Sequence, residues 1–294
     1  MDYDKLLDRY VVRPGTKVSL AKDFDPADDP LGLDKTSARD FLRKGRQRLA
    51  EFQDKLYAQD TFALLIILQA MDAAGKDGLI KHVMSGVNPQ GVDVHSFKAP
   101  STEELDHDYL WRCFRALPER GRIGIFNRSY YEEVLVVRVH PEILAKEKMP
   151  AEAKGKGIWK RRFEEINNFE RYLVDNGIVV LKFFLHVSKE EQKKRFLQRI
   201  ERPEKNWKFS AADVKERACW DDYQTAYEDC LRHTSTKAAP WYVIPADSKA
   251  FARVAVTAAI YRKLKSLNVE YPVVDEEQRK TLEEARKVLE SEKD

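Results

Sequence analysis

Lys76 stands directly behind Gly75, at the end of a short stretch of small and polar residues that contains one carboxylate, Asp72. An apolar run, 62–68, precedes this stretch, and an amphipathic segment, 79–84, follows it. A buried strand, a small-residue loop, Gly-Lys and a helix form the layout that wraps backbone N–H groups around a phosphate, with the lysine neutralising the charge. The sequence therefore predicts a phosphate-binding loop.

This loop departs from the usual pattern G-x-x-x-x-G-K-[ST] at two positions. Ala70 stands where the first glycine would be, and Asp77 stands where a hydroxyl would hold Mg²⁺. The strand before and the helix after favour a phosphate site, although a plain strand-to-helix turn with a solvated lysine stays open as the alternative. The residues expected to bind phosphate here are Ala73, Ala74, Gly75, Lys76, Asp77, Gly78 and Lys81.

Asp72 is an unusual residue for the inside of such a loop. A carboxylate would repel a phosphate unless a metal ion lay between them. Asp72 is therefore the first candidate for a Mg²⁺ ligand or a base, and the alternative is an Asx-type turn residue.

A second candidate site follows the apolar strand predicted over 122–127. Phosphate-loop enzymes place a Mg²⁺-positioning acid just past such a strand, but here the residue is Asn127, which is neutral. The next residue, Arg128, offers a fixed fork of donors suited to phosphate oxygens. The alternative is a strand-end turn with Arg128 in solvent.

A third candidate site is the basic segment 189–208, which carries eight positive and four negative residues. Arg195, Arg199 and Arg202 share one helical face, while Phe196 and Ile200 are expected to point to the core. A charged helix is usually just a solvated surface. Because this one follows a strand whose carboxyl end should line the phosphate edge, a phosphate-binding role is favoured.

Apolar strands alternate with helices along the chain, which indicates an α/β fold with a parallel sheet covered on both faces. Strands are expected over 62–68, 91–97, 122–127, 178–187 and 241–245, and helices over 36–59, 101–114, 158–175, 188–201, 210–232 and 248–267. In such folds ligands bind at the carboxyl ends of the strands. Asp72 and Arg128 should therefore lie along one edge.

The flanking segments differ in composition from this α/β region. Residues 1–35 have little periodicity and are expected to form an extended arm, and 269–294 are expected to form a charged helix. Between them, 36–268 form the main domain. Within it, the Pro- and Gly-punctuated stretch 141–175 is expected to be a mobile lid.

Composition narrows the class of protein. The chain has 294 residues, 43% of them hydrophobic and 34% charged, with a formal net charge of +3. That charge is too small to argue for nucleic-acid binding overall. There is no apolar run of about 20 residues and no signal-peptide pattern, and the three cysteines lack metal-ligand spacing. We expect a cytoplasmic protein that binds neither nucleic acid nor membrane.

Several ordered motifs together resemble the second polyphosphate kinase family, whose members transfer phosphoryl groups between inorganic polyphosphate and nucleotides. These motifs are QAMDAAGKDG, FNRSYYEE, KFFLHVSKEEQKKRFLQR, NWKFS and APWYVIPADSK, and the likeness extends over about 41–267. The resemblance implies a phosphate-loop kinase fold like that of the thymidylate kinases, with Mg²⁺, a helical lid and a basic channel. It also implies polyphosphate and adenine nucleotides as partners, and we expect a homo-oligomer.

The resemblance also implies roles for particular residues. Asp72 and Lys76 would be the essential loop pair, with the metal on Asp72, and Arg128 would clamp phosphate. Arg195, Arg199 and Lys208 would be channel or transition-state contacts, and Asn127 and Glu133 would face the acceptor nucleotide. Many relatives carry Asp in place of Asn127. This departure resembles the subgroup that phosphorylates both nucleoside mono- and diphosphates.

Two other functions stay open at this point. An ATP-dependent nucleoside monophosphate kinase would share the fold, but it would want a hydroxyl at position 77 and the complete glycine pattern. A non-catalytic module that binds RNA or another polyanion could use the same basic helix, but it leaves Asp72 unexplained.

Overall fold

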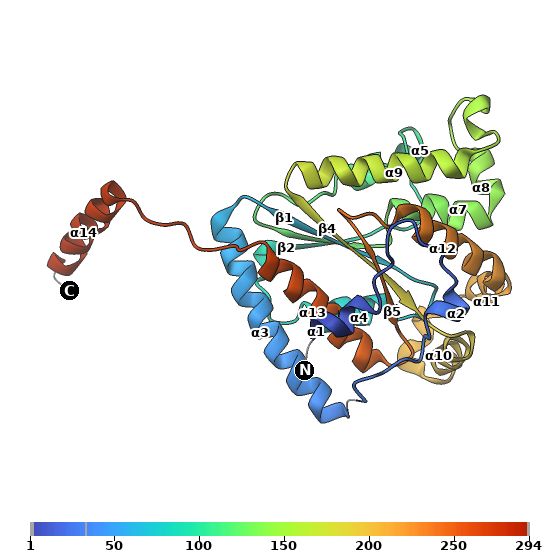
Figure 1. The fold of residues 1–294 in the computed structure, drawn as a ribbon, viewed down its shortest axis with the longest axis horizontal. Helices are drawn as coiled ribbons and strands as arrows, with labels where there is room; N and C mark the ends of the chain where they lie inside the picture. The colour runs from blue at the N-terminus through green and yellow to red at the C-terminus, as the bar shows by residue number, and fades with distance from the viewer. Residues whose placement is uncertain (1–2, 33, 293–294) are drawn as a thin grey trace.

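A parallel sheet of five strands, in the order β2-β3-β1-β4-β5, forms the centre of the molecule (Figure 1). The chain is described by a computed structural model that covers residues 3–32 and 34–292. The strands are β1 (Ala63–Gln69), β2 (Val92–Ser96), β3 (Ile123–Asn127), β4 (Ile178–His186) and β5 (Trp241–Pro245). Every residue of β1, β4 and β5 is buried, as their continuous apolar runs require.

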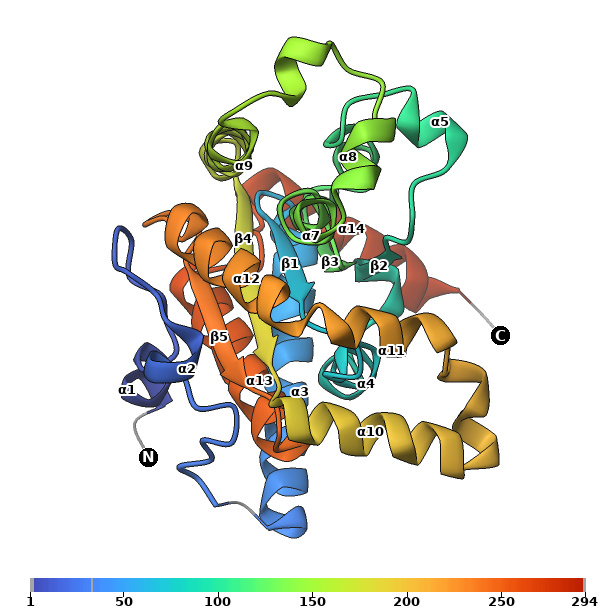
Figure 2. The same cartoon turned by 90° about the vertical axis from the view of Figure 1, so that its right-hand side faces the viewer.

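Helices cover both faces of the sheet, so the predicted three-layer α/β fold is confirmed (Figures 1 and 2). One face carries α3 (Lys35–Gln59), α4 (Lys76–Val83) and α13 (Lys249–Ser266), and the other carries α7 (Val136–Val139), α9 (Ile158–Asp175) and α12 (Trp220–Thr234). The carboxyl ends of the strands face a hairpin made of α10 (Lys189–Glu201), the 3₁₀ helix η4 (Pro203–Lys208) and α11 (Ala211–Ala218).

The remaining elements are short, apart from a C-terminal helix. They are α1 (Tyr3–Asp8), α2 (Leu20–Asp23), η1 (Pro89–Gly91), α5 (Thr102–Leu105), α6 (Trp111–Phe114), η2 (Tyr130–Val134), α8 (Pro141–Lys146), η3 (Ala151–Lys154) and α14 (Glu276–Ser291). No helix within 3–32 or 34–292 combines the length and the apolar character that crossing a bilayer demands.

Two helices that were expected to be continuous are broken. The capping box of Ser101 and Glu104 forms as predicted, but α5 ends after one turn, and the Asp108 carboxylate accepts the Leu110 N–H at 2.9 Å in the following turn. A side chain that captures a backbone donor in this way competes with the helix. The helix expected over 210–232 likewise divides at Cys219, between α11 and α12.

The N-terminal segment packs on the domain. The Val12 N–H donates to the Trp241 carbonyl at 2.9 Å, and the Val243 N–H donates to the Tyr10 carbonyl at 2.8 Å. Residues 10–12 therefore run antiparallel beside β5 and cover the outer edge of the sheet, which would otherwise be open to pairing with other chains. Leu7, which is fully buried, adds an apolar anchor.

One buried ion pair interrupts the apolar run of β4. Lys182 Nζ donates to Glu170 Oε2 of α9 at 2.6 Å and to the Thr234 carbonyl of α12 at 2.7 Å. The hydroxyls of Tyr130 and Tyr131 donate to the other Glu170 oxygen at 2.9 and 2.7 Å. Because every partner is buried and hydrogen-bonded, this network fixes η2, which follows the β3 end, against the sheet.

Candidate functional site

The loop between β1 and α4 has the backbone shape of an anion site. Gly75 directly precedes the first turn of α4 and has φ of 110°, a backbone conformation that would be strained in any residue with a side chain. Ala73 also has a positive φ, of 60°. No side chain caps the amino end of α4. Its first N–H groups therefore remain available to an anion, with the positive end of the helix dipole behind them.

Lys76 lies inside this loop. Its Nζ donates to the Ala70 carbonyl at 2.7 Å, and only 8% of the residue is exposed. Burial, together with the nearby positive charge of Arg128, lowers the pKa of Lys76 to about 8. A phosphate entering the loop would replace one carbonyl with several anionic oxygens, which favour the charged form of the lysine.

Asp72 and Arg128 form an ion pair across the loop. Arg128 Nη2 lies 2.9 Å from Asp72 Oδ1, and the Arg128 N–H donates to the Leu68 carbonyl at 3.0 Å. Arg128 has φ of 65°, a strained conformation for a side chain of this size. This conformation aims the guanidinium back over the end of β1, where Asp72 lies. The sequence prediction that these two residues meet at one edge is confirmed.

Asn127 lies at the same edge but faces the other side of the loop. Strand register places it beside both Leu68 and Ser96, and its Nδ2 donates to Asp77 Oδ1 at 2.8 Å. The Asn127 amide is the hydrogen-bond donor in this contact, and the Asp77 carboxylate can only accept. A carboxylate at position 127 would instead oppose a second carboxylate at hydrogen-bond distance.

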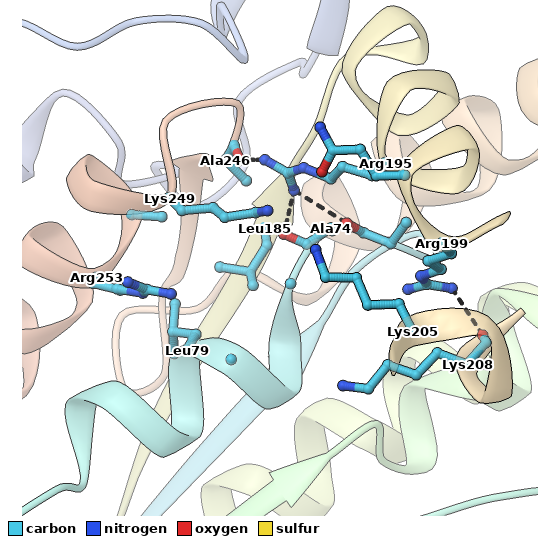
Figure 3. Close-up of a pocket in the computed structure, with 15 residues that line it drawn as sticks. Ala74, Leu79, Leu185, Arg195, Arg199, Lys205, Lys208, Ala246, Lys249 and Arg253 are labelled. Atoms are coloured by element: carbon cyan, nitrogen blue, oxygen red, sulfur yellow. Dashed lines mark hydrogen bonds between the residues drawn. The ribbon is translucent and has the colours of Figure 1, made fainter. Parts of the chain in front are cut away.

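Arg195 holds the loop in shape. Its Nη1 donates to the carbonyls of Ala74 and Ala73 at 2.8 and 3.1 Å, and its Nη2 donates to the Ala246 carbonyl at 2.6 Å (Figure 3). Its Nε lies 2.8 Å from Glu191 Oε1. Only 4% of Arg195 is exposed, and its donors are bound to protein oxygens. Arg195 therefore links the phosphate loop to the carboxyl end of β5.

The orientation predicted for Ile200 is wrong. Ile200 is 50% exposed, whereas Gln192, Arg195 and Phe196 of the same helix are buried. The reason is that α10 extends past the sheet, so that only its first half has a core to pack against (Figure 2). The aromatic side chains of Trp220, Tyr223 and Tyr227 in α12 are buried, with at most 8% of each exposed.

A cavity of about 220 Å³ opens on one side of the loop (Figure 3). Its basic side chains come from three elements and are Arg195, Arg199, Lys205, Lys208, Lys249 and Arg253. None of the fifteen described residues that line it carries a carboxylate or an aromatic ring. This basic cavity therefore suits a ligand that is an anion along its whole length.

Two of these cations were missed by reasoning from the sequence. Lys249 and Arg253 lie four residues apart at the start of α13, directly after the β5 strand. Burial lowers the pKa of both groups. The rule applied to the other strands, that polar residues past a strand end line the site, would have found them.

A smaller cavity of about 50 Å³ lies on the other side of the loop. Here the charges are mixed, and the charged residues that line it are Asp72, Arg128, Glu132, Asp213, Glu216 and Arg217. The last three belong to α11 and were missed, because nothing in their local sequence shows that this helix returns over the loop. This mixed cavity can hold an anion together with a cation.

The hairpin α10–η4–α11 contributes side chains to both cavities. By contrast, no described residue of 141–175 lines either of them. That stretch is joined to η2 by Arg162, which is almost fully buried and whose Nη1 donates to the Glu133 carbonyl at 2.9 Å. The lid expected over 141–175 stays a prediction.

Five expected site residues line neither cavity. They are Lys81 and Glu133, together with Lys76, Asp77 and Asn127, which lie in or beside the loop. Glu133 is buried, with an oxygen 3.4 Å from Arg162 Nη1, and burial raises its pKa to about 7. Lys81 is exposed on the outer surface of α4. The remaining predicted residues of the loop, together with Arg199 and Lys208, lie at the cavities or, like Asp77, beside them.

The residues present fit a metal ion that would be held mainly by the phosphate oxygens of a bound substrate and by only a few protein groups. Within the described part of the chain, no group of three or more His, Cys, Asp or Glu could hold a metal. Asp72 offers one oxygen, Oδ2, for which no hydrogen bond is found among the described residues, beside the mixed cavity. Mg²⁺ commonly takes one or two carboxylates and completes its shell with water and phosphate oxygens.

Known proteins resemble this chain over nearly its whole length. The family model described as "Polyphosphate kinase 2 (PPK2)" matches residues 32–272. A protein from Rhodopseudomonas palustris named "ADP-polyphosphate phosphotransferase" is 53% identical over 96% of this chain and 97% of its own. One from Meiothermus ruber named "AMP/ADP-polyphosphate phosphotransferase" is 45% identical over 90% of this chain and 95% of its own.

A solved structure agrees with these relatives. The crystal structure of polyphosphate kinase 2 from Arthrobacter aurescens TC1 superposes with a TM-score of 0.84, at 39% identity, over 99% of this chain and 98% of that one. The phosphate loop, its two cavities and these likenesses agree on one assignment. The chain belongs to the polyphosphate kinase 2 family.

Proposed function

We propose that this protein transfers phosphoryl groups from inorganic polyphosphate to AMP and ADP. The observation that carries the proposal is the pair of cavities on either side of the phosphate loop: the charged residues that line one are all cations, and those that line the other carry both signs of charge. The relatives named for AMP and ADP support the choice of acceptor.

The basic cavity suits polyphosphate as the donor. A polyphosphate chain carries about one charge per phosphate and has no base or sugar, so it needs cations at intervals and no stacking surface. ATP would gain from an aromatic ring on which its base could stack, and no aromatic ring is present among the residues that line this cavity. This favours polyphosphate over ATP.

The mixed cavity suits the terminal phosphate of the acceptor. Arg128 would hold it in line with the last phosphate of the donor, and Lys76 would turn from the Ala70 carbonyl to the transferred group. An acceptor oxygen forms a bond to that phosphorus, the bond to the next polyphosphate oxygen breaks, and the shortened chain leaves with the electron pair. The acceptor oxygen is already anionic, so positioning and charge stabilisation supply most of the rate.

We propose Mg²⁺ as the cofactor, with Asp72 as its protein ligand. When bound, the ion offsets charge on the phosphate oxygens. The Asp72 carboxylate lies beside the Arg128 guanidinium. A Mg²⁺ ion on Asp72 would therefore lie next to the phosphate that Arg128 binds.

The basic cavity makes a prediction about affinity. Replacing Lys249 or Arg253 with alanine should raise the KM for polyphosphate about tenfold, with kcat changing much less, because each cation contacts the chain away from the transferred group. The effect should shrink at high salt. Steady-state rates against polyphosphate concentration measure it, and Lys263→Ala, at the far end of the same helix, is the matched control. A change in kcat alone would contradict the assignment.

The neutral amide at Asn127 makes a prediction about acceptors. It can hydrogen-bond either a phosphate oxygen or a metal-bound water, so AMP and ADP should both react. With AMP, polyphosphate and a myokinase inhibitor, ADP should form first and ATP should follow. If ADP accumulates without ATP, and ADP supplied directly is inert, the dual-acceptor proposal is wrong.

An assay without ATP separates the three candidate functions. The protein is incubated with polyphosphate, ADP and Mg²⁺, and nucleotides are quantified by chromatography. ATP that forms only when polyphosphate is present supports the proposal, because a nucleoside monophosphate kinase can make ATP and AMP from two molecules of ADP without it. An ATP-dependent kinase would form none from polyphosphate, and a binding module would retain polyphosphate without turnover.

We also propose that the protein is a homo-oligomer in the cytoplasm and that it has no nucleic-acid or membrane partners.

A further inference from the structure

Arg217 of α11 is a cation of the mixed cavity for which no acidic partner is found among the described residues. Its Nη1 donates to the Lys189 carbonyl and to Gln192 Oε1, both at 2.8 Å. Its other two nitrogens, Nε and Nη2, make no hydrogen bond within the described chain. Part of this guanidinium is therefore available to a ligand.

The carboxylates that line the same cavity already accept from protein donors. Glu216 Oε2 accepts from the Tyr223 hydroxyl at 2.6 Å, and Asp213 Oδ2 lies 3.4 Å from Arg199 Nη1. The other two acidic residues of the cavity, Asp72 and Glu132, accept from the side chains of Arg128 and Gln69. Arg217 is thus the cation there whose charge the protein leaves for an anion.

The position of Arg217 is fixed on two sides. The Lys189 carbonyl and the Gln192 amide hold its Nη1. Its guanidinium carbon also lies over the ring of Trp220, 6.0 Å from the ring centroid, and Trp220 is only 8% exposed. A fixed guanidinium with free donors suits phosphate, whose oxygens can accept two parallel hydrogen bonds from it.

Gln192 connects Arg217 to the phosphate loop. It lies near the start of α10 and is only 1% exposed. Its Nε2 donates to the Asp72 carbonyl at 3.0 Å, while its Oε1 accepts from Arg217. The orientation of the amide follows from these partners, because a carbonyl can only accept and a guanidinium can only donate. One buried side chain therefore fixes Arg217 relative to the backbone that carries the Asp72 carboxylate.

We propose that Arg217 binds a phosphate of the acceptor nucleotide, and that Gln192 is the positioning residue that holds Arg217 against the phosphate loop. Arg217 lines the mixed cavity and not the basic cavity, which assigns it to the acceptor rather than to polyphosphate. The inference rests on the proposed function for the identity of the ligand. Arg128, which follows β3, and Arg217, from the hairpin, would then bind the acceptor from two separate elements.

The first test is the kinetic effect of Arg217→Ala. The KM for ADP should rise about tenfold or more, because hydrogen bonds from a charged donor to phosphate are lost. The KM for polyphosphate should stay within about twofold of the wild type. Lys215→Ala, which removes an exposed cation from the same helix, is the matched control and should change neither KM. An unchanged KM for ADP, or a rise confined to polyphosphate, would overturn the assignment.

The second test asks whether Gln192 acts through Arg217. Gln192→Met keeps the length of the side chain but loses both hydrogen bonds, so it should raise the KM for ADP about fivefold. In an Arg217→Ala background the same substitution should raise it no further. Gln53→Met, which replaces an equally buried glutamine of α3, is the control for lost packing. If Gln192→Met raises the KM by the same factor in both backgrounds, Gln192 does not position Arg217.

Calorimetric titration with ADP and Mg²⁺, without polyphosphate, separates this inference from the proposed reaction. The wild type should bind ADP about tenfold or more tightly than Arg217→Ala. If the wild type binds ADP in this way but transfers no phosphate to it, the proposed reaction fails and the role of Arg217 stands. If both proteins bind ADP equally well, the role of Arg217 is wrong, whatever the reaction.

Discussion

Replacing Lys76 with alanine should reduce kcat with polyphosphate and ADP roughly 10³-fold, because one preorganised cation at the transferred phosphoryl group is worth about that much. Lys76 is the buried cation of the phosphate loop, and in the free protein its Nζ is held by the Ala70 carbonyl. In so enclosed a position, a water molecule cannot replace the positive charge with which Lys76 would stabilise the transition state. Single-turnover measurements with saturating substrates separate this loss from weaker binding.

The control for Lys76→Ala is Lys263→Ala, which removes a half-buried lysine from the far end of α13 and should leave turnover within about twofold. Thermal unfolding and circular dichroism should show that both variants are folded. Turnover of Lys76→Ala within tenfold of the wild type would contradict the role proposed for Lys76.

The same lysine predicts a pH dependence. Burial and the charge of Arg128 lower its pKa to about 8, so the free protein loses this charge as the pH rises through that value. The ratio kcat/KM for polyphosphate reports the free protein and should decline above about pH 8. In Lys76→Arg, whose guanidinium stays charged, this decline should be absent, although the absolute rate is lower. An identical alkaline limb in both proteins would assign it to another group.

Replacing Asp72 with asparagine should lower kcat about 10²-fold while the fold is kept, because the carboxylate is partly exposed and its work is electrostatic. Two roles are possible for it. It can hold Mg²⁺ through its second oxygen, or it can only orient Arg128 through the first, which lies 2.9 Å from the guanidinium.

The Mg²⁺ dependence of Asp72→Asn distinguishes these roles. If Asp72 is a metal ligand, the Mg²⁺ concentration that gives half-maximal rate should rise at least tenfold in the variant, and Mn²⁺ should shift it in parallel. If Asp72 only orients Arg128, that concentration should be unchanged. Near-normal turnover together with an unchanged Mg²⁺ requirement would exclude both roles.

The parts of the fold set by local pattern were predictable from the sequence. The apolar runs of β1 and β4 can be satisfied only inside a covered parallel sheet, and Gly-Lys after the first of them marks the phosphate loop. Strand-end residues such as Asp72 and Arg128 then meet because parallel strands share one carboxyl edge. Each of these inferences needs only residues near one another in the chain.

The parts set by distant contacts were not predictable. Arg195 is buried because its donors find carbonyls at Ala73, Ala74 and Ala246, which are 122, 121 and 51 positions away. No local pattern distinguishes such an arginine from one that faces solvent. The return of α11 over the loop is equally non-local, because it depends on how far α10 extends past the sheet before η4 reverses the chain (Figure 2).

Transfer of label from polyphosphate to ADP in a single turnover tests the proposed reaction most directly. The protein, in excess over ³²P-labelled polyphosphate, is mixed with ADP and Mg²⁺ in the absence of ATP, quenched, and its products are separated. We predict that label appears in the terminal phosphate of ATP as polyphosphate shortens, and that Lys76→Ala abolishes this transfer on the same timescale. Label that remains in polyphosphate, or appears only as orthophosphate, would contradict phosphoryl transfer at this site.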